Sequence, residues 1–201
     1  MDAQEEATRI PGPFEVSLRP VVEDDLPALM RWLADPEVIQ FYGDPPSDLD
    51  EARVDYLDPD PACPTWRYVI EVDGRGVGEI QCYHRYPGPE YEWDAGIDIF
   101  IGDPGARGQG AGIEAIRVML RHLFEVKGVH RVIIDPEVKN ARAIHVYERA
   151  GFHLDGVVRH HAFEHGEYVD TQFLTILEDE WPAARERWAV ERGVPIPGPT
   201  A

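Results

Sequence analysis

Four segments in the first half of the chain have the short apolar pattern of strands: residues 14–18, 66–72, 76–86 and 92–102. Asp73-Gly74 separates the second segment from the third, and this dipeptide favours a tight hairpin turn. The fourth segment is apolar on both faces around its centre, which is typical of a strand covered by helices on both sides. We therefore expect a sheet that begins with antiparallel strands.

In other segments apolar residues recur about every 3.6 positions, which indicates amphipathic helices. Asp24 is the candidate N-cap of the first helix. Asn140 is the candidate N-cap of a later one, which Gly151 would end. The predicted helices cover 25–33, a short stretch within 43–64, 109–126, 141–149 and 179–190, and further strands are predicted at 130–135, 152–163 and 167–178.

This order predicts one α/β domain with a mixed (α+β) sheet over residues 14–190. Residues 1–13 would form a flexible arm and 191–201 a disordered tail. The strand–helix–strand order in the middle of the chain implies a parallel pair of strands with a right-handed crossover. In such sheets ligands bind where neighbouring strands diverge, at their carboxyl ends.

Composition narrows the classes of partner. The chain has 201 residues, 43% of them hydrophobic, and a formal net charge of −19, which disfavours nucleic acid and anionic membranes and attracts polycations. A merely solvated acidic surface is the alternative interpretation. Two cysteines, Cys63 and Cys82, form no disulfide framework or zinc set. Without a signal peptide or a long apolar stretch, we expect a cytoplasmic protein that does not span a membrane.

The strongest local signal is a glycine-rich loop, residues 103–112, between a predicted strand and a predicted helix. Glycines at a helix start leave backbone N–H groups free to bind an anion and let phosphate oxygens approach closely. Arg107 adds a fixed positive charge. A glycine-rich turn without a ligand is the alternative.

Two motifs in this region resemble those of the GNAT acetyltransferases. Arg107-x-x-Gly110-x-Gly112 is similar to the pyrophosphate-binding signature of that family, and Asn140-x-x-Ala143-x-x-x-Tyr147-x-x-x-Gly151-Phe152 to its second signature. The resemblance covers roughly residues 14–178. It implies the GNAT fold, a central mixed sheet flanked by helices, with acetyl-coenzyme A as co-substrate and no metal.

By this resemblance, the loop backbone would bind the pyrophosphate and the strand at 99–101 would pair with the pantetheine arm. Tyr147 would lie near the sulfur, although it could equally be a core tyrosine that packs on Phe152. The residues expected to bind the coenzyme are Ile99, Phe100, Ile101, Arg107, Gly108, Gln109, Gly110, Ala111, Gly112, Asn140, Ala143 and Tyr147. The spacing of the last three places them on one helix face.

Two aspartates stand out on the predicted strands. Asp98 interrupts an apolar run, where a carboxylate is costly unless it is paired or used. Asp135 ends the next parallel strand. If the two strands are neighbours, both aspartates edge the same crevice. The alternatives are a structural partner for Asp98 and a turn-forming role for Asp135.

Further polar residues share faces with these aspartates. Glu79, Gln81 and Tyr83 alternate on the preceding strand, and Glu92 and Asp94 share the face of Asp98 by parity. We expect these side chains, with Asp98 and Asp135, to bind a polycationic small molecule. A solvated acidic end of the sheet is the alternative.

These details resemble the aminoglycoside 6′-N-acetyltransferases, through Gln81-x-Tyr83, Gly96-Ile97-Asp98, Asp135-Pro136 and residues 141–152; residues 99–106 depart from that pattern. The resemblance implies acetylation of an aminoglycoside amine, with antibiotic resistance as the result. Asp98 would accept the proton and Tyr147 would protonate the thiolate. Two alternatives remain: a GNAT enzyme for another amine (a protein N-terminus, a polyamine or a siderophore precursor), and a coenzyme-binding module without catalysis.

Overall fold

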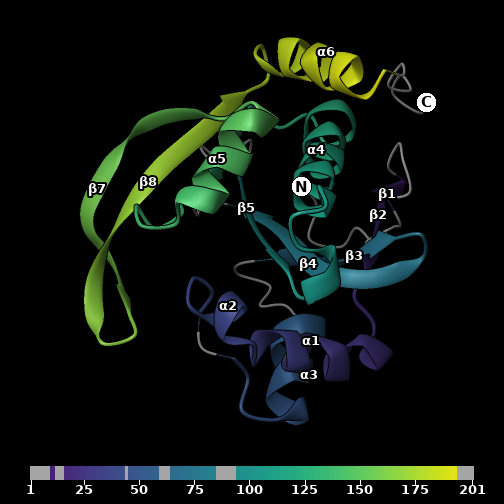
Figure 1. Ribbon diagram of the computed structural model, residues 1–201, viewed down its shortest axis with the longest axis vertical. Coiled ribbons are helices and arrows are strands. Elements are labelled where there is room, and N and C mark those ends of the chain that lie inside the picture. Colours follow the sequence, from purple (N-terminus) through teal and green to yellow (C-terminus); the bar gives the residue numbers. More distant parts are fainter. Residues whose placement is uncertain (1–9, 12–15, 44, 59–63, 85–93, 194–201) are drawn as a thin grey trace.

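The computed structural model describes residues 10–11, 16–43, 45–58, 64–84 and 94–193. Its centre is one sheet with the strand order β1-β2-β3-β4-β5-β6-β8-β7, and helices cover both faces (Figure 1). The strands are β1 (Ile10–Pro11), β2 (Val16–Pro20), β3 (Thr65–Val72), β4 (Arg75–His84), β5 (Asp94–Ile101), β6 (Arg131–Ile134), β7 (His153–Glu164) and β8 (Glu167–Leu177). The helices are α1 (Leu26–Leu33), α2 (Pro36–Ile39), α3 (Leu49–Leu57), α4 (Ala111–Arg121), α5 (Ala141–Ala150) and α6 (Trp181–Arg192).

The turn signals of the sequence are confirmed. Asp73 and Gly74 have φ values of 51° and 74° in the β3–β4 hairpin, which matches the positive φ that such two-residue turns require. The side chain of Asn140 accepts a hydrogen bond from the N–H of Ala143 and so caps α5, and Gly151 ends that helix with a φ of 116°. Local backbone chemistry therefore sets these boundaries.

Two apolar layers explain why β5 is apolar on both faces. Ile97 belongs to the large core that α4 and α6 form with one face of the sheet, together with Ile116 and Trp188. Phe100 belongs to a second cluster, in which α1, α2 and α3 pack on the opposite face. In Figure 1 these three helices lie below the sheet, while α4 and α6 lie above it.

The strands β5 and β6 are parallel, as the strand–helix–strand order predicts, but they pair only briefly. Asp94, Ala95 and Gly96 pair with residues 131–133, whereas β5 continues along β4 as far as Ile101. Within the described residues, the edge of β5 beyond Gly96 therefore has no neighbouring strand on the side of β6. Since successive residues of a strand turn their backbone groups to alternate sides, half of the N–H and C=O groups from 97 to 101 face this opening.

Three boundaries differ from the predictions. The prediction of Asp24 as N-cap of α1 is wrong, because Asp25 holds that position. The carboxylate of Asp25 accepts the N–H of Val22 and pairs with Arg19 of the preceding strand. Within the predicted N-terminal arm, β1 pairs with β2. Within the predicted tail, α6 continues to Arg192, which forms an ion pair with buried Glu114. Long-range pairing extends both ends of the domain.

A short helix, α2, was not predicted and proves important for the site. Asp35 caps it by accepting the N–H of Glu37, and it leads into residues 40–43. Across the described part of the chain, each helix is too short or too polar to cross a membrane.

Candidate active site

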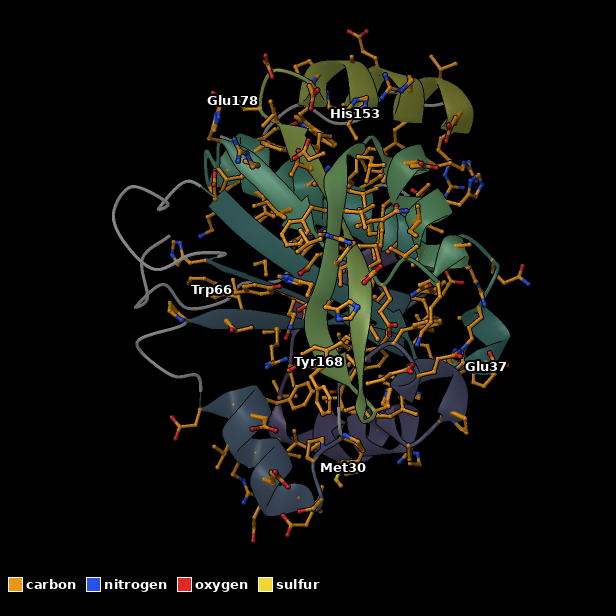
Figure 2. All side chains as sticks on the ribbon, turned by 90° about the vertical axis from the view of Figure 1, so that its left-hand side faces the viewer. Met30, Glu37, Trp66, His153, Tyr168 and Glu178 are labelled. Atoms are coloured by element: carbon orange, nitrogen blue, oxygen red, sulfur yellow. The ribbon has the colours of Figure 1, made fainter. Side chains whose placement is uncertain are left out.

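A cavity of about 950 Å³ opens where β5 and β6 diverge. It is lined by the diverging strand ends, the start of α4, one face of α5, residues 40–43 and the β7–β8 hairpin. The hairpin reaches down to the level of α2, as both views show (Figures 1 and 2). The predicted crevice is therefore present, and two segments that the motifs do not include form part of its walls.

One end of the cavity is formed by the glycine-rich loop. Gly108 and Gly110 have φ values of 73° and 91°, and a Cβ atom at either position would meet no atom within 4 Å. Gly110 begins α4 without a side-chain cap, so N–H groups of the first helical turn remain available. Gly108, Gly110 and Gly112 line the cavity. This uncapped helix start has the features of an anion-binding site.

The side chain of Arg107 has partners that were not predicted. Its guanidinium lies 2.7 Å from Asp35 and 2.9 Å from Glu37. It also donates to the carbonyl oxygens of Ile101 and Gly102. Arg107 lines the cavity, so its role in binding the coenzyme stays a prediction; two carboxylates balance its charge, and the side chain fastens the loop to α2. Sequence reasoning did not see this because α2 is distant in the chain.

The motif residues of β5 and α5 line the same cavity. Ile99, Phe100 and Ile101 lie along the open edge of β5. Asn140, Ala143 and Tyr147 line it together, so they share one face of α5 as their spacing predicts. Gln109 and Ala111 of the loop do not line it. Arg142, an exposed cation at the start of α5, does so and was missed because it sits between motif positions.

Tyr147 fits both interpretations given to it. Its ring packs edge-on against Phe152, with 6.1 Å between the centroids, and the residue is only 7% exposed. It also lines the cavity. Burial, and then the negative charges of Asp98 and Asp135, hold the pKa of its phenol well above the ordinary value. The phenol therefore keeps its proton at neutral pH and lies within electrostatic reach of both carboxyl groups.

Asp98 lies on the cavity wall in an ordered polar row. Gln81 Nε2 donates to one carboxylate oxygen at 2.6 Å, and the Tyr83 hydroxyl lies 3.4 Å from the other. The amide oxygen of Gln81, Oε1, accepts a hydrogen bond from the guanidinium of Arg67 on β3. The predicted shared face of Gln81, Tyr83 and Asp98 is thus present, and it orients the Asp98 carboxylate.

Asp135 follows β6 and lies on the opposite wall. Its side chain is 19% exposed, and its Oδ2 lies 3.6 Å from Nε2 of His161 on β7. Asp98 and Asp135 both line the cavity, so the expectation that they edge one crevice is confirmed. His161 was not predicted, since no motif marks it.

Of the residues expected to bind substrate, three do not line the cavity and a fourth lies outside the described residues. Glu79 is fully buried and accepts the hydroxyl of Tyr42, because α1–α3 cover its face of the sheet. Asp94 lies 3.9 Å from Arg131 and is 12% exposed. Tyr83 packs its ring over Gly96 and reaches the site through Asp98. None of these three lines the cavity. Glu92 lies outside the described residues.

Other parts of the cavity wall hold residues that sequence reasoning missed. Residues 40–43 follow α2, and Glu137 follows β6. Glu164 and His165 lie at the tip of the β7–β8 hairpin.

Comparison with known proteins agrees with this architecture. A model of the acetyltransferase (GNAT) domain matches residues 21–160. An aminoglycoside N(6′)-acetyltransferase type 1 of Klebsiella pneumoniae is 28% identical over 71% of this chain and 76% of its own length. A spermidine N(1)-acetyltransferase of Escherichia coli K12 is 24% identical over 87% and 92%.

The solved structure of the aminoglycoside acetyltransferase AAC(6')-Ib in complex with coenzyme A superposes with a TM-score of 0.69 at 26% identity. The match covers 86% of this chain and 98% of that one. The fold is therefore shared along nearly the whole length of that enzyme. Because the family model matches well over half of the residues of this chain, the chain belongs to the GNAT acetyltransferase family.

Proposed function

We propose that this protein transfers the acetyl group of acetyl-coenzyme A to an amine of an aminoglycoside, at the 6′ position. The observation that carries the proposal is the make-up of the cavity. One end is an uncapped helix start suited to phosphate, and Asp98 and Asp135 stand on opposite walls of the other part. The strongly acidic chain would attract a polycation over a distance.

The residues present fit acetyl-coenzyme A. The open space at Gly108 and Gly110 admits phosphate oxygens, and the unpaired edge of β5 from 99 to 101 can hydrogen-bond an extended amide-containing arm. Asn140 and Ala143 complete this wall. When bound, the co-substrate supplies an activated thioester.

The acceptor must lose a proton before it can attack. A free alkylamine is largely protonated at pH 7, since its pKa is roughly that of lysine, about 10. Asp98, held by Gln81, is placed to accept that proton directly or through water. Asp135 binds a second ammonium group and so orients the substrate.

Two roles remain: protonation of the leaving sulfur and stabilisation of the negative charge on the carbonyl oxygen. Tyr147 keeps its phenolic proton at neutral pH and donates it to the leaving sulfur. An N–H group from 99–100 on the open edge of β5 would stabilise the negative charge that develops on the carbonyl oxygen.

A polyamine is the second candidate acceptor. The similarity to the spermidine acetyltransferase extends over 87% of this chain, compared with 71% for the aminoglycoside enzyme. Glu137 and Glu164 add carboxylates along the cavity, which would suit a long linear polycation.

A thiol-release assay separates these candidates. We expect acetyl-coenzyme A to be consumed with kanamycin and tobramycin, and mass spectrometry to place the acetyl group on the 6′-amine. A 6′-hydroxyl aminoglycoside should react far more slowly. Faster turnover of spermidine than of either drug would replace the aminoglycoside proposal with the polyamine one. Drug-susceptibility tests in bacteria that express the gene would then measure resistance.

A further inference from the structure

Glu79 of β4 is a buried carboxyl group that the proposed transfer mechanism does not use. It is 0% exposed. Its partners across the sheet are Val69 and Phe100, both members of the apolar cluster beneath α1–α3. Placing an ionised carboxylate in such a layer is costly unless it is well paired. Glu79 lies two residues before Gln81, on the same face of β4, so its presence beside the Gln81–Asp98 pair calls for a physical reason.

The two oxygens of Glu79 have unequal surroundings. Oε2 accepts the hydroxyl of Tyr42 at 3.0 Å. Oε1 lies 3.8 Å from Arg67 and makes no hydrogen bond within the described residues. Arg67 itself donates to Gln81, the residue that holds Asp98. Glu79 is thus hydrogen-bonded to Tyr42 but only weakly paired with Arg67, whose guanidinium binds Gln81 instead.

The surroundings favour the neutral form of Glu79. Burial is the main cause that raises its pKa to about 8; Arg67 and the bond from Tyr42 oppose this, and Asp98 adds to it. Tyr56 of α3 and Cys82 of β4 also interact electrostatically with it, and burial holds the pKa of Tyr42, Tyr56 and Cys82 above the ordinary values. At pH 7 the side chain is therefore mostly a carboxylic acid.

Tyr42 connects this buried acid to the substrate. Residues 40–43 line the cavity, and the Tyr42 ring packs edge-on against Phe100, with 4.9 Å between the centroids. The bond to Glu79 is a direct polar contact between this wall and the sheet. A change at Glu79 would therefore reach the amine without direct contact.

We propose that Glu79 is a positioning residue: its buried carboxyl anchors Tyr42 and, through Tyr42, the wall that follows α2. In its neutral form the same carboxyl also keeps a second negative charge away from Asp98. This inference rests on the acetyl-transfer site proposed above. When Glu79 ionises in alkaline solution, the added charge binds the acceptor ammonium more tightly but makes it harder to deprotonate.

Steady-state kinetics with kanamycin and with spermidine test this role. Tyr42→Phe keeps the ring but loses the hydroxyl, and it should raise the KM of the amine about three- to tenfold, the effect of one hydrogen bond. The KM of acetyl-coenzyme A should stay within about twofold, because the coenzyme end is untouched. An unchanged amine KM in this variant would overturn the proposed anchor.

Glu79→Gln removes the charge at every pH and keeps an oxygen that can accept from Tyr42. It should match the wild type at pH 7, whereas above pH 8 both the amine KM and kcat of the wild type should fall below those of the variant. Glu71→Gln is the matched control: Glu71 is also buried in the sheet, pairs with Arg19 and is absent from the cavity lining. Parallel pH profiles for wild type and Glu79→Gln would contradict the proposed charge effect.

Urea unfolding gives a readout that needs no activity. Because the folded pKa of Glu79 is raised from 4.5 to about 8, the unfolded chain loses this proton first as the pH rises. The stability of the wild type relative to Glu79→Gln should therefore fall between about pH 5 and pH 8 and then level off. A stability difference between wild type and Glu79→Gln that does not change with pH would contradict a neutral Glu79 carboxyl. If neither amine is acetylated while this fall is seen, the proposed function fails and the protonation state of Glu79 stands.

Discussion

The two ends of the cavity, which we propose bind the coenzyme and the amine and name accordingly, are built in different ways. The coenzyme end comes from two continuous segments, the loop before α4 and the first turns of α5, and it offers mostly backbone N–H groups and open space at glycines. The amine end brings together side chains from β4, β5, β7 and the segments after α2 and β6. The common co-substrate is thus met by local backbone geometry, while the acceptor is met by packing between distant elements.

This difference has a physical origin. A positive φ at Gly110 or a cap at Asn140 depends on a few neighbouring residues. The position of Asp135 relative to Asp98 depends on how β5 and β6 diverge and on what packs against them. Substitutions at the amine end should therefore change turnover or amine binding, and substitutions at the coenzyme end should change coenzyme affinity.

The largest effect should come from Asp98→Asn. The variant keeps the shape and the contact with Gln81 but loses the proton acceptor, so kcat should fall about 10³-fold. Asp94→Asn is the matched control, since Asp94 is on the same strand face but pairs with Arg131 away from the cavity. An equal loss in both variants would show that the effect belongs to the strand rather than to the site.

Tyr147→Phe should lower kcat about 10²-fold, the usual range for losing a general acid, and leave the affinity for acetyl-coenzyme A nearly unchanged. The reason is that only the phenolic proton is removed while the ring still packs on Phe152. Tyr168→Phe, at an exposed residue of the hairpin, provides the comparison. Wild-type turnover of Tyr147→Phe across the pH range would rule out the proton-donor role.

Gly110→Asp tests the coenzyme end. A carboxylate at this helix start should weaken acetyl-coenzyme A binding about thirtyfold, because helix-terminus interactions reach about 2 kcal/mol. Calorimetry on the folded variant measures it. Gly74→Asp has a similar φ, +74° against +91°, and equally open surroundings, but it lies in the β3–β4 hairpin. Unchanged affinity in Gly110→Asp would refute the anion site.

Asp135→Asn should give the smallest of these effects, about a tenfold rise in the amine KM with little change in kcat, as expected for one hydrogen bond to a charged group. Glu167→Gln, at a side chain 71% exposed and outside the cavity, should change KM less than twofold. If high salt abolishes the effect of Asp135→Asn, that carboxylate acts only through long-range attraction.

Arg107 and Glu79 show where sequence reasoning stopped. The motif position of Arg107 correctly placed its loop at the cavity, but its side chain turns to Asp35 and Glu37, about seventy residues earlier in the chain. Strand parity correctly placed Glu79 on the face of Gln81, yet α1–α3 bury that part of the face. In both cases the backbone was predictable, and the partner of the side chain was not.

Apart from β1 and α2, the sequence by itself determined the order of the strands and helices, the hairpin turns, the caps of α5 and the glycine-rich start of α4, because short-range sterics and hydrogen bonding decide these features. Only the tertiary structure decided that Arg107 pairs with Asp35 and Glu37, that Glu79 is buried against Tyr42, and that the β7–β8 hairpin brings His161 to Asp135. The physical reason is that a side chain takes the partner and exposure that packing leaves to it, and packing depends on residues far away in the chain.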